Sequence, residues 1–304
     1  MPSLVPLDNL LGAAFIGIMI STAIYGITCL QGYIYYSENS SGDNQHLKIF
    51  VGALIALDTF HVMLLGIFYY HYTVTNFGDY VQLLDSTWSL LAQVIVEDVI
   101  ALMVQFFFAY RIYHLSEKNM LVPTAVCILS IGQLGFTVVA VNVKEFKESE
   151  AMKPWTISGM ASSVACDVII TISMIYYLWS QKQQGNESDY QQADALLAKY
   201  RHVACFLTTV FAIATSITFV TNETSLVYGP FFFVLSRMYA CSFLALLNTR
   251  HHLRENLNTD VELYPNSGPN AYPSAIAFAS GDSSTIGDYA KHGSQDNAKA
   301  PNAY

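Results

Sequence analysis

Seven long apolar segments divide the chain, and polar stretches separate them. They cover residues 10–36, 48–72, 87–110, 121–141, 155–179, 203–221 and 227–248. A helix rises about 1.5 Å per residue, so each segment is long enough to cross about 30 Å of hydrocarbon. The runs are continuous, whereas the strands of a membrane barrel alternate apolar and polar residues. The pattern therefore predicts an all-α, polytopic membrane protein with a bundle of seven transmembrane helices.

The composition changes after the seventh segment. Residues 255–304 are rich in Asn, Ser, Ala, Gly and Pro and contain few large apolar side chains. Such a stretch cannot bury enough apolar surface to offset the entropy of ordering its backbone. We therefore expect a seven-helix transmembrane domain at residues 1–254 and a disordered cytosolic tail at residues 255–304.

The basic residues predict the orientation of the helices. With the N-terminus outside, the cytosolic segments hold eight Lys and Arg residues, and the outer segments hold three, all between positions 144 and 153. Cytosolic loops of membrane proteins carry an excess of Lys and Arg. We therefore expect an outer N-terminus and a cytosolic C-terminus, in the plasma membrane or a membrane of the secretory pathway.

Overall composition agrees with a membrane location. Only 12% of the 304 residues are charged, about half the share in soluble domains. The net charge is -9, and no basic stretch indicates a nucleic-acid partner. All five cysteines lie inside apolar segments, which favours small packing residues over a disulfide framework. We therefore expect the lipid bilayer to be a partner of this protein.

Ionisable residues inside the apolar segments are candidates for function, because a charge in the bilayer centre is costly and usually faces the bundle interior. They lie at similar expected depths: Asp58, Glu97, Asp98, Asp167 and Arg237. We hypothesise that Arg237 pairs with Asp167 or Asp98 and anchors a polar layer across the bundle. A buried carboxyl without a partner should hold a proton or bind a cation. A structural layer without any ligand is the alternative.

Two further patterns refine this candidate site. Asp58 and His61 are three residues apart and therefore share one helix face, where the carboxylate can orient the imidazole or relay protons. Glu97 and Asp98 are adjacent and point about 100° apart. We take Asp58, His61, Asp98, Asp167 and Arg237 as the candidate ligand- or ion-binding residues.

Other candidates lie at the ends of the segments. Arg111, His202, Arg250 and Arg254 form an expected basic rim at the cytosolic side, where lipid phosphates or a cytosolic partner would bind. Asn222 begins a glycosylation sequon in a short loop expected outside.

Several classes of seven-helix and membrane enzymes are disfavoured. The seventh segment contains no Lys for a retinal Schiff base, and His61 is the only deep histidine. Haem ligation and a clustered zinc site are therefore not expected. The chain also lacks a phosphate-binding loop and a serine-nucleophile motif. We expect a protein that is not an enzyme and binds no cofactor or metal.

Short motifs recur in order along the segments. The longest is SRMYACSFLALLNTR at 236–250, and shorter ones are Leu30-Gln31-Gly32-Tyr33 and Leu57-Asp58-Thr59-Phe60-His61. In these motifs the chain resembles a family of multi-pass membrane proteins abundant in mushroom-forming fungi and known only as a domain of unknown function. The resemblance implies a seven-helix membrane fold and no particular activity.

The sequence supports three roles. The leading hypothesis is a receptor-like module that senses a small or lipidic ligand from outside or from the bilayer and acts on a cytosolic partner. A proton- or cation-coupled transporter or channel is the alternative, because the buried carboxyl groups outnumber the buried cation. A non-catalytic membrane scaffold is the third.

Overall fold

The computed structural model describes residues 11–40, 42–79, 87–116, 118–142, 149–184, 190–221 and 228–263, with side chains except at 149–152, 178–184, 190–205 and 250–263. Within these ranges the chain forms α-helices and no strand. The helices are α1 (Ala13–Ile34), α2 (Gln45–Tyr70), α3 (Trp88–Leu115), α4 (Leu121–Asn142), α5 (Ser149–Gln184), α6 (Tyr190–Thr221) and α7 (Gly229–Leu263). Two π-helical segments, η2 (Tyr35–Asn39) and η3 (His71–Thr75), continue α1 and α2.

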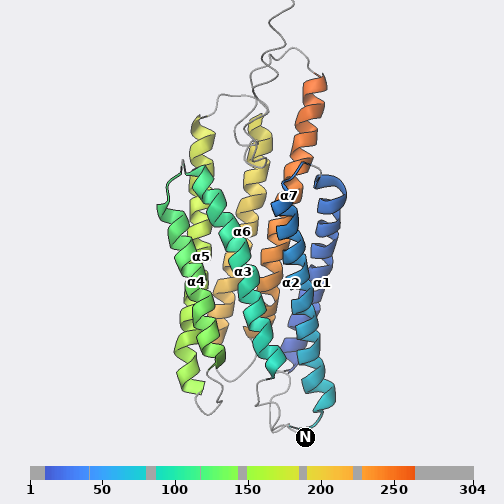
Figure 1. Cartoon of the computed structure of the whole chain (residues 1–304), viewed down its shortest axis with the longest axis vertical. Helices are drawn as coiled ribbons and strands as arrows, with labels where there is room; N and C mark the ends of the chain where they lie inside the picture. Colours follow the sequence, from blue (N-terminus) through green and yellow to red (C-terminus); the bar gives the residue numbers. More distant parts are fainter. Residues whose placement is uncertain are drawn as a thin grey trace, which may run out of the picture.

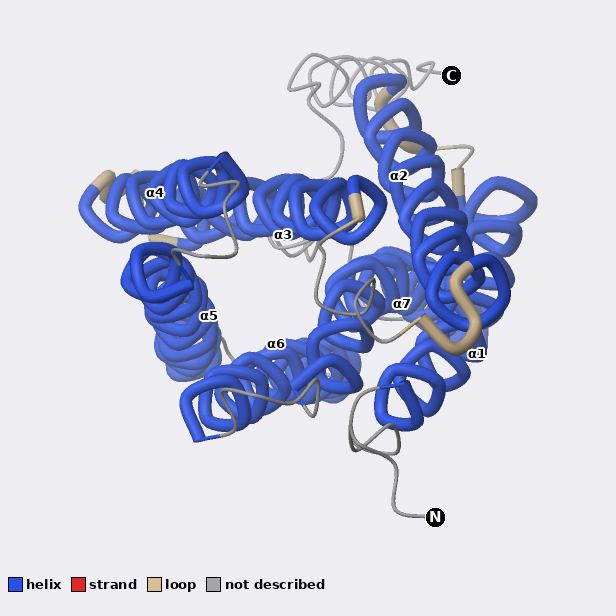
Figure 2. Tube along the Cα trace, turned by 90° about the horizontal axis from the view of Figure 1, so that it is seen from below, coloured by secondary structure: helices blue, strands red, loops and turns tan. Residues whose placement is uncertain are grey.

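The helices stand side by side and successive ones run antiparallel, so α1 begins and α7 ends at opposite ends of the bundle (Figure 1). Seen end-on, each helix lies next to its neighbours in sequence, and α7 closes the ring against α1 (Figure 2). Helix α7 also contacts α2, α3 and α6, and α3 contacts α2, α4, α5 and α7. These two helices therefore carry the side chains that meet inside the bundle.

The outer surface is apolar and the interior is partly polar, which is the reverse of a water-soluble helix bundle. On α1 the large side chains of Phe15, Met19 and Ile20 are exposed, whereas Gly17 and Ser21 are buried. A soluble protein rarely exposes so continuous an apolar surface. In lipid the arrangement is expected, because small and polar residues are favoured where membrane helices touch.

Six helical stretches of the described chain are long and apolar enough to cross a membrane. They are Ala13–Asn39, Gln45–Thr75, Trp88–Leu115, Leu121–Asn142, Lys153–Tyr177 and Gly229–Thr249. The described apolar part of α6, Phe206–Thr221, is shorter. The structure thus confirms the all-helical prediction with six to seven apolar helices.

Helix α7 is the most enclosed of the candidate spans. In its most apolar window 67% of the residues are buried, against a third or less in the other five candidate spans. Its contact with α1 is close because Gly17 faces Pro230, whose Cα would lie 2.6 Å from a Cβ added at that glycine. Glycine is therefore required at position 17 for α1 to approach α7 as it does.

The boundary of the tail differs from the sequence-based prediction. The composition placed the start of a disordered tail at Glu255, but α7 continues to Leu263. No Pro or Gly occurs between positions 251 and 263, and Pro265 follows shortly after the helix ends. Proline is common just past a helix end because it cannot continue the helix. The prediction for residues 264–304 lies outside the described residues.

Candidate functional site

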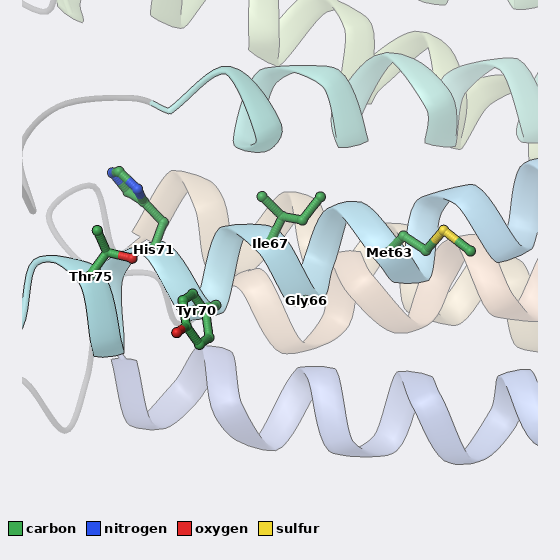
Figure 3. A pocket seen from close by; sticks show the side chains of 6 residues that line it. All are labelled: Met63, Gly66, Ile67, Tyr70, His71 and Thr75. Carbon is green, nitrogen blue, oxygen red and sulfur yellow. The ribbon is translucent and has the colours of Figure 1, made fainter.

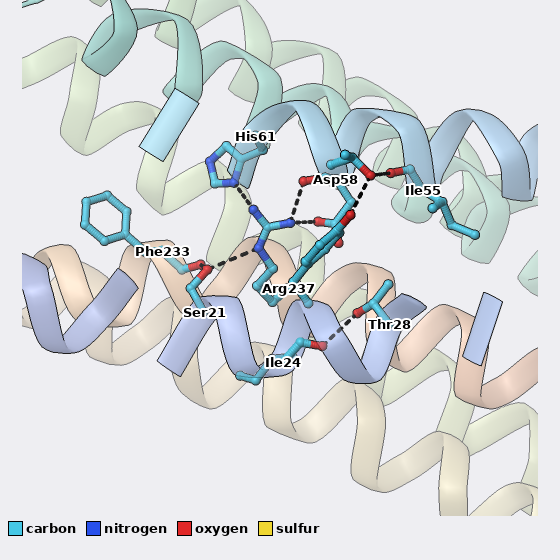
Figure 4. A network of polar contacts seen from close by, with 10 residues as sticks. Ser21, Ile24, Thr28, Ile55, Asp58, His61, Phe233 and Arg237 are labelled. Carbon is cyan, nitrogen blue, oxygen red and sulfur yellow. Dashed lines mark hydrogen bonds and ion pairs between the residues drawn. The ribbon is translucent and has the colours of Figure 1, made fainter. Parts of the chain in front are cut away.

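The guanidinium of Arg237 lies at the centre of a buried polar cluster between α1, α2 and α7 (Figure 4). Its Nη1 donates to the backbone carbonyl of Asp58 at 2.8 Å and forms an ion pair with the Asp58 carboxylate. Its Nη2 lies 2.5 Å from Nδ1 of His61, and its Nε donates to Oγ of Ser21 at 3.1 Å. We call Ser21, Asp58, His61 and Arg237 the Arg237 cluster.

All four side chains of the Arg237 cluster have 0% exposure. The positive charge is therefore enclosed by the bundle and balanced by the carboxylate of Asp58. Removing one partner from a buried ion pair costs much more than breaking a surface pair, because an uncompensated charge stays behind. The Arg237 cluster thus ties α1, α2 and α7 together at one level.

The contacts of Arg237 also determine how His61 is protonated. A guanidinium only donates hydrogen bonds, so Nδ1 of His61 accepts the bond from Nη2. The proton of the neutral imidazole then lies on Nε2. Within the described chain Nε2 is buried and has no hydrogen-bond partner. His61 therefore presents a free N–H donor to the interior.

Helix α1 supplies two residues of this region that the sequence analysis missed. Ser21 accepts from Arg237 and donates to the backbone carbonyl of Phe233 at 3.0 Å. The Cζ of Arg237 lies 5.7 Å from the ring centroid of Tyr25, within the range of a cation–π contact. The four-residue spacing of Ser21 and Tyr25, one helix turn on the same face, was the available signal.

The hypothesis that Arg237 pairs with Asp167 or Asp98 is wrong, because its carboxylate partner is Asp58. The reason is rotational. Arg237 and Tyr239 are two residues apart on α7 and point about 200° apart. Arg237 faces α1 and α2, whereas Tyr239 faces α3 and α5.

Asp167 belongs to a second buried cluster. Its carboxylate accepts a hydrogen bond from the hydroxyl of Tyr239 at 2.5 Å and one from Nε2 of Gln105 at 3.4 Å. These residues border an internal cavity of about 10 Å³ between α3, α5, α6 and α7. Such a volume corresponds to about one water molecule. The Asp167 cluster, Gln105, Asp167 and Tyr239, is therefore a compact interhelical contact.

Asp98 lies in a third place, on the side of α3 that faces α4. Its Oδ1 accepts a hydrogen bond from Nε2 of Gln133 at 2.6 Å. The adjacent Glu97 is buried on another face of α3, with 3% exposure. Glu97, which is not among the candidate residues, is buried on the same face of α3 as Gln93 and Gln105, whereas Asp98 points toward α4.

The five candidate residues thus do not form one contact cluster. Asp58, His61 and Arg237 come together, Asp167 joins Gln105 and Tyr239, and Asp98 joins Gln133.

A larger hollow lies on the outer face of α2, with a volume of about 490 Å³ (Figure 3). It is lined by Met63, Gly66, Ile67, Tyr70, His71 and Thr75. The hollow is wide open, and Met63, Ile67 and Tyr70 are exposed. Apolar side chains at one end and polar ones at the other match the change from hydrocarbon to the polar interface of a bilayer.

Candidates at the helix ends are only partly described. Arg111 lies in the last turns of α3 and is half-buried. The side chains of His202, Arg250 and Arg254 lie outside the described residues, as does Asn222. At the end of the bundle where α1 ends, Asn248 accepts a hydrogen bond from Asn39 at 2.9 Å and donates to the carbonyl of Gln31 at 2.9 Å.

Part of the chain matches a known protein family. Residues 163–252 are similar to a family of unknown function (DUF6534). No curated protein and no solved structure matches the chain. The matched segment includes Asp167, Arg237 and Tyr239, so both clusters draw on it. The match agrees with the expected resemblance to a domain of unknown function, and its description assigns no activity.

Proposed function

We propose that this protein is a receptor-like membrane module in which a small or lipidic ligand alters the buried polar contacts of α7. The excess of basic residues predicts that the end of the bundle where α7 terminates faces the cytosol. A cytosolic partner would bind there, near the basic rim of Arg111, His202, Arg250 and Arg254. The host membrane would be the plasma membrane or one of the secretory pathway.

One observation carries this proposal: both buried clusters meet on α7. Arg237 holds it to α1 and α2, and Tyr239 holds it to α5. The helix then continues without a break to Leu263. From Arg237 to that end, 26 residues at the rise of an α-helix span about 39 Å. A change at either cluster would therefore be carried along a rigid helix to the end of the bundle.

The proposal can be tested by distance measurements in lipid nanodiscs. Spin-labelled amino acids would be placed at His46, at the start of α2, and at Asn258, in the last turns of α7. Electron–electron double resonance would then compare the wild type with Arg237→Met and Tyr239→Phe. We expect both variants to shift or broaden the distance distribution, because each frees one side of α7.

Thr218→Ala is the matched control, because the hydroxyl of Thr218 donates to carbonyl groups within α6. Its distance distribution should equal that of the wild type. Unchanged distributions in both α7 variants would refute a role of α7 in transmitting a signal.

A proton- or cation-coupled transporter or channel is the second candidate. The observation in its favour is that Asp58, Glu97 and Asp98 each have a buried carboxyl oxygen without a hydrogen-bond partner in the described chain. Proton and cation flux would be measured in proteoliposomes with Asp58, Asp98 and Asp167 neutralised one at a time. Flux that these substitutions abolish favours the transporter. If neither flux nor motion of α7 is detected, the remaining hypothesis is that the protein is a non-catalytic membrane scaffold.

A further inference from the structure

The inward face of α3 is polar at almost every turn. Counting in steps of four residues, it presents Ser89, Gln93, Glu97, Ala101 and Gln105, none more than 3% exposed. Residues four apart lie one above another on a helix. A row of buried polar side chains in lipid is costly unless partners satisfy it. Ser89 and Gln105 have such partners, Thr87 and Asp167. Both amide atoms of Gln93 and one carboxyl oxygen of Glu97 have none in the described chain.

Glu97 stands where this row meets α2 and α7. Leu90, Phe68 and Phe233 pack in one apolar cluster, which fixes the register of the three helices. Glu97 lies seven residues after Leu90 on α3, and His61 lies seven residues before Phe68 on α2. Both are therefore about 10.5 Å from that cluster along their helix axes. One turn along α7 lies Arg237, whose long side chain reaches the same level.

Several polar atoms at this level have no hydrogen-bond partner in the described chain. They are Oε2 of Glu97, both amide atoms of Gln93, Nε2 of His61 and Oδ2 of Asp58. Gln93 and His61 have 0% exposure. The carboxyl of Glu97 is therefore buried at the level of donors and acceptors that have no hydrogen-bond partner in the described chain.

The charges around Glu97 do not balance if it is ionised. Arg237 of α7 is the nearby cation, and its charge is already matched by Asp58 of α2. His61 of α2 accepts from Arg237 and is neutral. On α3 itself Asp98 adds a like charge. Helix α4 contributes the uncharged Gln133 to Asp98, and α5 brings Asp167 to Gln105, two turns away.

We propose that Glu97 is a proton-binding site. Its carboxyl carries a proton while Arg237 pairs with Asp58. On release, the O–H bond breaks, the proton passes to water, and the electron pair stays on the carboxylate. Arg237 then faces two carboxylates and is shared between Asp58 and Glu97. Proton occupancy therefore decides whether α7 is tied to α2 alone or to α2 and α3.

This inference goes beyond the proposed receptor-like role, because it names a ligand and holds for a transporter equally. Infrared difference spectroscopy of the protein in nanodiscs, recorded between two pH values, detects the C=O stretch of a protonated carboxyl group. We expect the wild type to lose one such band as the pH is raised. Glu97→Gln should lack that band, and the neighbouring Asp98→Asn should retain it.

A second variant tests the competition for Arg237. Asp58→Asn removes the present partner of the guanidinium, so Glu97 should release its proton and pair with Arg237. The titrating band should then be missing at neutral pH although Glu97 is intact. Glu97→Asp, which keeps a carboxyl at a changed position, should shift the band and serves where Glu97→Gln does not fold.

Four results would overturn the proposal. The titrating band persists unchanged in Glu97→Gln and in Glu97→Asp, or it disappears in Asp98→Asn, or Asp58→Asn leaves it as in the wild type. The fourth result comes from adding sodium at fixed pH and recording the same band. If sodium removes the wild-type band as effectively as a rise in pH, the site binds a metal cation and the assignment to a proton fails.

Discussion

The pairing of Arg237 with Asp58 predicts a strong energetic coupling between α7 and α2. Arg237→Met keeps an apolar stem of similar length and removes the guanidinium. The carboxylate of Asp58, at 0% exposure, then lies buried without its counter-ion. Breaking a buried ion pair from one side costs about 3–5 kcal/mol, and we expect this loss in the free energy of unfolding.

A double-mutant cycle isolates the coupling. Asp58→Leu removes the carboxylate, and the double variant replaces the pair with apolar side chains, which is often neutral for stability. The double variant should therefore be more stable than the sum of the single losses predicts. Interhelical hydrogen bonds in membrane proteins average about 0.6 kcal/mol in such cycles. A coupling above about 2 kcal/mol would identify a charge pair and not a hydrogen bond alone.

Unfolding can be followed by titrating the protein in mixed micelles with dodecyl sulfate. The ring of Trp155 lies 6.2 Å from that of Phe136. With Trp88 and Trp179 replaced by Phe in all variants, tryptophan fluorescence reports the separation of α5 from α4. A parallel cycle with Arg237→Met and Asp167→Leu is the control, because the two residues share no contact. Its coupling should stay below about 0.5 kcal/mol. Coupling to Asp167 that equals or exceeds the coupling to Asp58 would refute the described cluster.

Two more substitutions test other contacts in the same unfolding assay. Tyr239→Phe removes the hydroxyl that donates to the buried carboxylate of Asp167, and we expect a loss of about 1–2 kcal/mol; a wild-type value would contradict that contact. Gly17→Ala places a Cβ 2.6 Å from the Cα of Pro230, and overpacking of this kind costs about 1–3 kcal/mol. Gly26→Ala, where a Cβ meets nothing within 4 Å, should stay within about 0.5 kcal/mol of the wild type.

The positions of the helices could be predicted because hydrocarbon thickness fixes the length of an apolar helix. The segments expected at residues 87–110 and 121–141 correspond to α3 and α4 within a few residues at each end. The shared face of Asp58 and His61 was predictable in the same way, since three-residue spacing brings side chains together in any helix. Both residues contact Arg237.

The partner of Arg237 could not be predicted, because depth along a helix does not specify rotation about its axis. Asp58, Asp98 and Asp167 had similar expected depths, and only the packing of the bundle separates them. Which of Glu97 and Asp98 points inward could not be predicted for the same reason, since adjacent residues point about 100° apart. The polar residues Gln93 and Gln105, four and eight residues from Glu97, were a signal that Glu97 belongs to the inward face.

Rotation of α7 is the property that its polar contacts determine. Lipid tails are as apolar as leucine, so no hydrophobic force drives membrane helices together or orients them. Arg237 and Tyr239 make polar contacts from opposite sides of α7, and turning the helix in either direction lengthens both. The two opposed pairs, together with the hydrogen bonds of Asn248 to Asn39 and Gln31, favour one orientation of α7. A ligand or proton that releases one pair therefore changes the rotational freedom of the whole helix as far as Leu263.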